Sequence, residues 1–144
     1  RVYGYDREAQ DGNLHYQPFS KEGFMGDLAS SKAVMATAGF TLMSEALWLK
    51  KPMLALPMAG QFEQQLNGYC LEQMGLGKNA PEPTREAVGD FLYRLPEYRA
   101  ALAQHKARDN TAILNKLDEL LADDCALARE FHANRKAYAA PDSA

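Results

Sequence analysis

The 144-residue sequence has no long apolar run, little net charge and only two cysteines. No segment approaches the roughly 20 consecutive apolar residues of a membrane-spanning helix, and no signal peptide opens the chain. The formal net charge of -3 gives no electrostatic reason for nucleic acid or an anionic membrane to be the main partner. Cys70 and Cys125 lie far apart without metal-ligand spacing, so we interpret them as free thiols in a reducing cytoplasm.

Several functional patterns are also missing. No G-x-G-x-x-G motif occurs, which argues against an NAD-type Rossmann dehydrogenase. No Asp-x-Asp pair suggests a metal site, and His15, His105 and His132 show no ligand spacing. The chain also begins at Arg1, without a methionine and directly with a strand-like run, as a segment of a larger protein would.

Short apolar runs alternate with helical patterns through the first half of the chain. The composition, 47% hydrophobic and 24% charged, is that of a globular domain with a real core. The strand-like runs cover residues 1–5, 13–19, 32–38 and 52–58, and the helical patterns cover residues 24–31, 40–50 and 62–75. This alternation predicts an α/β fold: a Rossmann-like parallel sheet of about four strands, with helices on both faces.

The second half of the chain is predicted to be helical. Pro81 and Pro83 break the chain, and Thr84 is a suitable start for a helix that ends near Leu95, where Pro96 follows. Apolar residues at helical spacing predict a long helix over 98–122, and a last helix is expected over 126–138.

The stretch VMATAGFTLMSEA places Gly39 where a strand turns into a helix. A helix N-terminus presents unpaired N–H groups and the positive end of its dipole, and a glycine lets a phosphate approach that backbone. Thr41 is positioned to cap the helix or to add a hydroxyl donor. Glu45, expected on the exposed rim of the helix, is suited to accept hydrogen bonds from a ribose diol. The plainer interpretation is a structural glycine and a solvated glutamate.

A second polar cluster, GQFEQQLN (60–67), follows the next strand at the same edge of the predicted sheet. Gln61, Glu63, Gln64 and Asn67 offer the donors and acceptors that sugar hydroxyls require. The alternative is a polar helix cap.

Residues 34–77, VMATAGFTLMSEALWLKKPMLALPMAGQFEQQLNGYCLEQMGLG, resemble the donor-binding C-terminal domain of GT-B glycosyltransferases, in the MurG-like branch that includes bacterial and archaeal teichoic-acid-type transferases. The matching features are Gly39, Ser44-Glu45, the following KP and strand, EQ-x-x-N at 63–67 and MGLG at 74–77. Two positions depart from the pattern: Thr37 stands where some branches have histidine, and Thr41 lies one position early.

The resemblance implies a role for each candidate residue. The backbone at Gly39, Phe40 and Thr41 would hold the diphosphate, and Glu45 the ribose. Glu63 and Gln64 would face the transferred sugar, with Gln61 and Asn67 beside them. The loop at Pro18, Phe19 and Ser20 would line the base. No catalytic residue and no metal ligand is assigned.

The resemblance further implies that the chain is the C-terminal part of a hexosyltransferase that acts by inversion. The donor would be a nucleoside-diphosphate sugar, UDP-linked, used without a cofactor or an obligate metal. Residues 1–95 would be the donor-binding α/β domain, lacking its first βα unit, and residues 96–144 its helical extension. The acceptor groove and general base would belong to an N-terminal domain, so the chain alone would bind weakly and catalyse nothing.

Localisation, partners and alternatives follow from the same resemblance. The protein is expected in the cytoplasm, and the resemblance allows peripheral association of the full enzyme with the inner face of the membrane. No nucleic acid is expected as a partner, and exposed apolar surface should make the chain self-associate. A nucleotide-sugar 2-epimerase of GT-B architecture and a non-catalytic interaction module remain as alternatives.

Overall fold

The computed structural model describes residues 1–106 and 110–122. The chain divides into two compact units, Arg1–Ala107 and Arg108–Ala144. The first unit holds both sheets and five helices, and the described part of the second consists of Asn110 and helix α6 (Thr111–Ala122).

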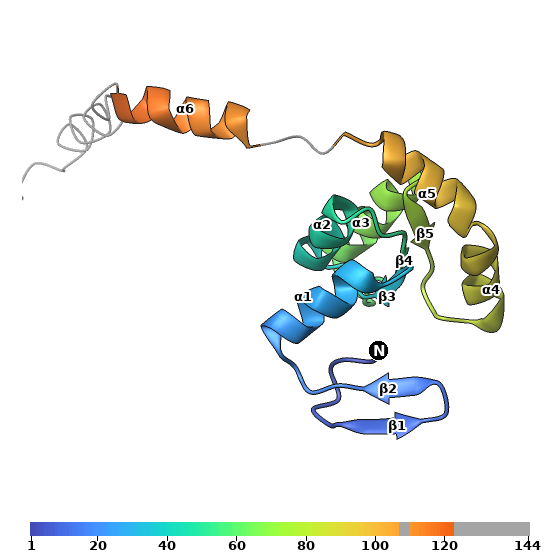
Figure 1. Cartoon of the computed structure of the whole chain (residues 1–144). Helices are drawn as coiled ribbons and strands as arrows, with labels where there is room; N and C mark the ends of the chain where they lie inside the picture. Colours follow the sequence, from blue (N-terminus) through green and yellow to red (C-terminus); the bar gives the residue numbers. More distant parts are fainter. Residues whose placement is uncertain (107–109, 123–144) are drawn as a thin grey trace, which may run out of the picture. The chain divides into compact units, whose positions relative to one another are not determined.

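A three-stranded parallel sheet forms the centre of the first unit (Figure 1). Its strands are β3 (Val34–Ala36), β4 (Met53–Ala55) and β5 (Gly77–Asn79), in the order β3-β4-β5. Helix α2 (Phe40–Trp48) connects β3 to β4, and helix α3 (Phe62–Gln73) connects β4 to β5. The predicted parallel pairing of the runs at 32–38 and 52–58 is therefore confirmed.

Helices cover both faces of this sheet, as predicted. Side chains alternate along a strand, so Met53 of β4 points to one face and Leu54 to the other. Met53 packs in a cluster with residues of α2 and α3 and with Leu102 of α5 (Leu95–Gln104), whereas Leu54 packs with α4 (Arg85–Tyr93) and with Tyr98 of α5. All three residues of β4 are fully buried, as expected for a central strand covered on both sides.

The two N-terminal runs do not join the central sheet. Instead, β1 (Ala9–Asp11) and β2 (Leu14–Tyr16) form an antiparallel hairpin, and Val2 makes an isolated parallel bridge to Tyr16. The hairpin turn is only two residues long and begins with Gly12 at φ +55°, and such short glycine turns favour hairpins over crossovers.

The third strand of the sheet, β5, was not predicted because its sequence GKN shows no apolar alternation. Gly77 explains the pairing: a Cβ added there would lie 2.2 Å from the carbonyl oxygen of Met53. The absence of a side chain allows the close approach of the two strands, which an apolar pattern does not reveal.

The helical second half differs from the prediction in where its helices begin and end. Helix α4 begins after Thr84, as predicted, and the Thr84 hydroxyl accepts a hydrogen bond from the Ala87 N–H at 3.1 Å. Pro96 lies in the first turn of α5, which begins at Leu95 and not, as was predicted, after the proline. The single long helix predicted over 98–122 is wrong, because α5 ends at Gln104 and α6 starts at Thr111. Asn110, directly before α6, is a residue type that favours a new helix start. The helix predicted over 126–138 lies outside the described residues.

Helix α1 (Lys21–Ser30) is attached to the N-terminal segment by polar contacts. The Tyr3 hydroxyl donates to the Asp27 carboxylate at 2.7 Å, and the Arg1 guanidinium lies 3.6 Å from the same carboxylate. Across residues 1–106 and 110–122, no helix has both the length and the apolar character needed to cross a bilayer.

Candidate functional site

Two loops follow the carboxyl ends of β3 and β4. Because these strands are parallel, both loops lie at the same edge of the sheet, where open α/β folds bind their ligands. The first loop, residues 37–39, leads into α2, and the second, residues 56–61, leads into α3. This edge therefore carries the N-termini of two helices, each with unpaired N–H groups and a positive dipole end.

Gly39 is the N-cap of α2, and neither its conformation nor its packing requires a glycine. Its backbone is extended, with φ -67° and ψ 135°, which any residue adopts. A Cβ added at Gly39 would meet no atom within 4 Å, and no side chain caps the first turn of α2. The position is thus open space beside unpaired backbone N–H groups, as the phosphate hypothesis requires.

The side chains that follow Gly39 are placed differently from one another. Phe40 is 66% exposed, and Thr41 is exposed in the first turn without capping the helix, so its predicted capping role is wrong. Glu45 is half-buried rather than fully on the rim, and its carboxylate pairs with no residue in the described ranges. Trp48, at the end of α2, is 66% exposed.

The first turn of α3 presents the second predicted cluster. Gln61 is the N-cap position, without a side-chain capping bond, and Glu63 is exposed. Gln64 is half-buried, and its Oε1 accepts a hydrogen bond from the Met58 N–H at 3.1 Å. The acceptor of Gln64 is therefore engaged by its own loop, which leaves its amide N–H groups as the part available to a ligand.

Asn67 links the two loops. It lies in the second turn of α3, and its Nδ2 donates to the carbonyl oxygen of Ala38 at 3.1 Å. This bond joins the helix after β4 to the residue before Gly39. The sequence-predicted residues Gly39, Gln64 and Asn67 are thus brought together at one edge of the sheet.

Phe19 and Ser20 lie at the start of α1. Phe19 is 75% exposed and contacts the ring of Phe24 at a centroid distance of 6.2 Å. Ser20 is the N-cap of α1, and its hydroxyl accepts a hydrogen bond from the Gly23 N–H at 3.3 Å. This hydroxyl therefore has a structural partner, and no hydrogen bond joins either residue to α2 or α3 within the described chain.

The sequence patterns predicted no role for two residues of this region. Asn79 ends β5 at the same edge of the sheet, and its Oδ1 is buried without a hydrogen-bond partner in the described structure. A Cβ added at Gly68 of α3 would lie 2.4 Å from this oxygen and 3.0 Å from Cγ of Pro57. Gly68 thus lets α3 sit close to the sheet edge, and the only signal in the sequence was an unexplained glycine inside a helix.

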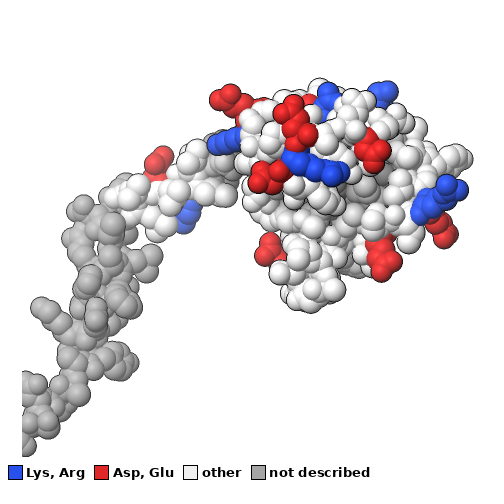
Figure 2. Space-filling view, turned by 90° about the horizontal axis from the view of Figure 1, so that it is seen from below, with Lys and Arg blue, Asp and Glu red and all other residues white. Residues whose placement is uncertain are grey.

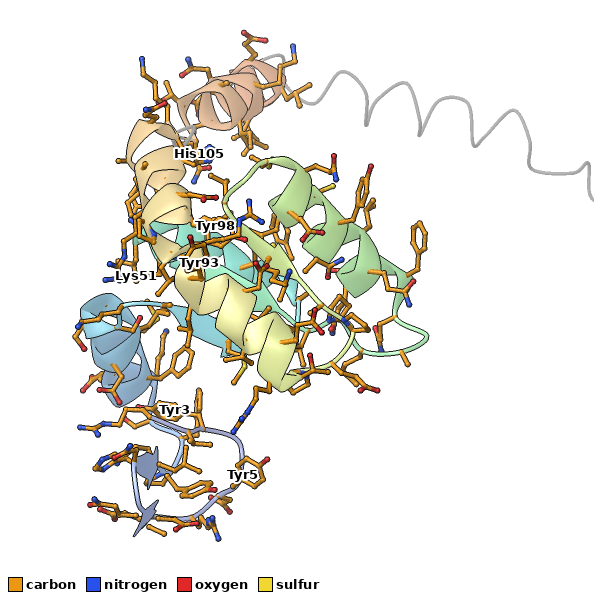
Figure 3. All side chains as sticks on the ribbon, turned by 90° about the vertical axis from the view of Figure 1, so that its right-hand side faces the viewer. Tyr3, Tyr5, Lys51, Tyr93, Tyr98 and His105 are labelled. Atoms are coloured by element: carbon orange, nitrogen blue, oxygen red, sulfur yellow. The ribbon has the colours of Figure 1, made fainter. Side chains whose placement is uncertain are left out.

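Charged groups with shifted pKa values lie elsewhere in the first unit. The Lys78 ammonium is 2.7 Å from the Asp90 carboxylate, and this hydrogen bond lowers the pKa of Asp90 and raises the pKa of Lys78. Burial raises the pKa of Tyr98, which lies between α5 and the sheet (Figure 3). Acidic and basic side chains are interspersed on the face shown in Figure 2. No three His, Cys, Asp or Glu side chains of residues 1–106 and 110–122 are grouped as metal ligands.

The chain matches known glycosyltransferases in sequence. The model of the family described as Glycosyl transferase family 1 matches residues 1–96. A glycosyltransferase of Methanosarcina mazei, described as uncharacterized, is 35% identical over 78 residues, which is 48% of this chain and 21% of that protein. The UDP-N-acetylglucosamine--N-acetylmuramyl-(pentapeptide) pyrophosphoryl-undecaprenol N-acetylglucosamine transferase of Methylorubrum extorquens is 30% identical over 116 residues, 77% of this chain and 31% of that protein.

Solved structures show the same fold. Spinosyn forosaminyltransferase SpnP superposes with a TM-score of 0.66 at 18% identity, over 83% of this chain and 34% of that one. The glycotransferase of kitacinnamycin superposes with a TM-score of 0.56 at 16% identity, over 69% of this chain and 28% of that one. The chain thus spans about a fifth to a third of the length of the curated relatives it matches.

Proposed function

This chain belongs to glycosyl transferase family 1, and from this premise we propose that it binds the nucleoside-diphosphate part of an activated sugar at the carboxyl edge of its sheet. The observation that carries the proposal is the environment of Gly39. Neither the packing nor the backbone conformation prevents a side chain at this position. The sequence nevertheless has a glycine there, directly beside the unpaired N–H groups of helix α2. Such a position suits an anion that must approach the backbone.

The other candidate residues bind the parts of the donor next to this diphosphate-binding position. The N–H groups of Phe40 and Thr41 bind phosphate oxygens together with Gly39. The carboxylate of Glu45, which has no partner in the described chain, accepts from the ribose hydroxyls. Phe19 and the backbone at Ser20 line the base, for which the exposed ring of Phe19 is available.

The sugar lies against the first turns of α3. The exposed Glu63 supplies an acceptor, and Gln64 supplies its amide donors, since its Oε1 is engaged by Met58. Gln61 completes this wall. Donors and acceptors are thus both present, as hydroxyl groups require.

The reaction of the whole protein is transfer of a sugar unit, of hexose type, to an acceptor with inversion. The negative charge that develops on the diphosphate leaving group is stabilised by the N–H groups and dipole of α2, which act without a metal ion. The groove that binds the acceptor and the general base are contributed by residues outside this donor site. This chain supplies the donor half of the site.

Substitution of Gly39 provides a direct test. Gly39→Asp introduces a good helix cap and a negative charge at the phosphate seat, so folding should be retained while UDP binding is lost. Two like charges about 4–6 Å apart repel by roughly 1–4 kcal/mol at effective dielectrics of 20 to 80, which predicts a loss of affinity of about fivefold or more. Gly39→Asn is the matched control, because it caps equally well without charge and should lose less. Calorimetric titration with UDP checks this, and equal affinity of Gly39→Asp and wild type would contradict the proposal.

A further inference from the structure

We infer that Asn67 is a positioning residue: it fixes the orientation of the Ala38–Gly39 peptide and thereby the N–H groups that receive the diphosphate. This inference rests on the proposed function and reassigns Asn67 from ligand contact to support of the site.

A hydrogen bond joins the side chain of Asn67 to the loop before α2. Nδ2 of Asn67 donates to the carbonyl oxygen of Ala38 at 3.1 Å, between residues 29 positions apart in sequence. Ala38 has 0% exposure, so water has little access to replace this partner. The side chain of Asn67 is itself half-buried and points toward the loop of the neighbouring strand.

The bond to the Ala38 carbonyl also sets the plane of the Ala38–Gly39 peptide. The described chain has no cis peptide, and in a trans peptide the C=O and the following N–H point in opposite directions. Holding the carbonyl of Ala38 therefore also fixes the direction of the Gly39 N–H. The same peptide precedes the N-cap of α2, so its tilt influences how the first helical N–H groups meet an anion.

Helix α3, which carries Asn67, is held to the sheet edge at several points. One turn earlier in α3, Gln64 binds the Met58 N–H of the other loop, so α3 holds both loops of the sheet edge. Gly68, the residue after Asn67, seats the helix tightly against Pro57 and Asn79. Because α3 is closely packed here, the backbone of Asn67 is held in place, and its side chain can orient the loop before α2.

The test exchanges the donor of Asn67 for an acceptor of the same size. Asn67→Asp cannot donate to Ala38 at neutral pH, and Asn67→Ala removes the bond without adding charge. Gln65→Glu is the matched control, since it makes the same amide-to-carboxylate change at an exposed position of the same helix. Calorimetric titration of the 144-residue chain uses uridine, UDP and UDP-glucose as probes, and hydrogen exchange reports the amides of Gly39 and Phe40 without ligand.

Both Asn67 variants should weaken the binding of UDP and of UDP-glucose by a similar factor of about tenfold and leave the binding of uridine unchanged. They should also speed hydrogen exchange of the Gly39 and Phe40 amides. Gln65→Glu should change none of these. The inference is overturned if the variants bind UDP as well as wild type does, or if they lose affinity for uridine to the same extent. It is also overturned if only the binding of UDP-glucose is weakened, since that result would make Asn67 a sugar contact. Failure of the wild type to bind UDP would instead remove the proposed function, and the inference with it.

Discussion

At the scale of single residues, the geometry separates side chains that support the site from those free to meet a ligand. Ser20, Gln64 and Asn67 were predicted as ligand contacts, and each makes a hydrogen bond to the backbone of a loop or helix end. Glu45 and Glu63 make no such bond in the described chain. Sequence patterns identify polar residues near a site but do not say which of their atoms are already engaged, because that depends on loops distant in sequence.

Glu45 offers the sharpest prediction at this scale. A carboxylate that accepts two hydroxyl protons makes charge-assisted bonds, so Glu45→Ala should cost about 1.5–3 kcal/mol in nucleotide binding, roughly ten- to a hundredfold. Folding should be unaffected, because Glu45 has no partner in the described chain that its removal would orphan. The 2′,3′-dideoxy nucleotide should bind wild type poorly and lose little more in the variant. Calorimetry with both ligands decides this, and unchanged binding of the normal nucleotide would make Glu45 an ordinary helix residue.

A prediction for Gln64 separates the role of its amide oxygen from the role of its amide N–H groups. Gln64→Ala should weaken binding of a UDP-sugar more than binding of UDP, since each lost bond to a sugar hydroxyl contributes on the order of 1 kcal/mol. Gln64→Glu keeps an acceptor for the Met58 N–H but removes the donors. It should therefore preserve the loop and still bind the UDP-sugar less well relative to UDP. Titration of both variants with both ligands measures the difference, and equal losses for the two ligands would place Gln64 beside the diphosphate or outside the site.

At the scale of elements, the sequence predicted those with clear periodicity and missed those that depend on glycine. The order β3-α2-β4-α3 was read correctly because apolar runs and helical stripes are strong local signals. The hairpin at Gly12 and the strand at Gly77 depend on a turn and on a close backbone approach, which leave no apolar pattern. The same limit applies to the candidate site: its two loops were predictable from strand ends, but the bond from Asn67 to Ala38 was not.

The close packing of α3 against the sheet can be tested with two glycine-to-alanine substitutions. One is expected to lower the free energy of unfolding and the other to raise it. Gly68→Ala forces a Cβ to within 2.4 Å of Asn79 Oδ1 and 3.0 Å of Pro57 Cγ. Overpacking of this kind typically costs 1–3 kcal/mol, which should outweigh the helix-propensity gain of about 1 kcal/mol. Gly26→Ala in α1 meets nothing within 4 Å and should stabilise by up to about 1 kcal/mol. Urea unfolding compares them, and stabilisation by Gly68→Ala would mean that α3 is loosely seated.

At the scale of the whole molecule, the first unit has an open sheet edge. Val34 and Ala36 of β3 bond to β4, as shown by the bonds from Val34 N to Pro52 O and from Leu56 N to Ala36 O. The backbone groups of Met35 between them therefore point to the other edge, where no strand pairs within the described chain. The Met35 side chain is 55% exposed. An edge strand without charge or proline is a template for pairing with another chain.

We therefore expect the chain to self-associate through β3. Met35→Lys places a charge on the edge strand, the usual means by which natural sheets prevent edge pairing, and should shift the chain toward the monomer without loss of folding. Gln73→Lys adds the same charge at an exposed position of α3 and should leave association unchanged. Light scattering over a concentration series measures the mass of each variant. A wild-type chain that stays monomeric at high concentration would contradict the expectation, and equal association of wild type and Met35→Lys would place the contact on another surface.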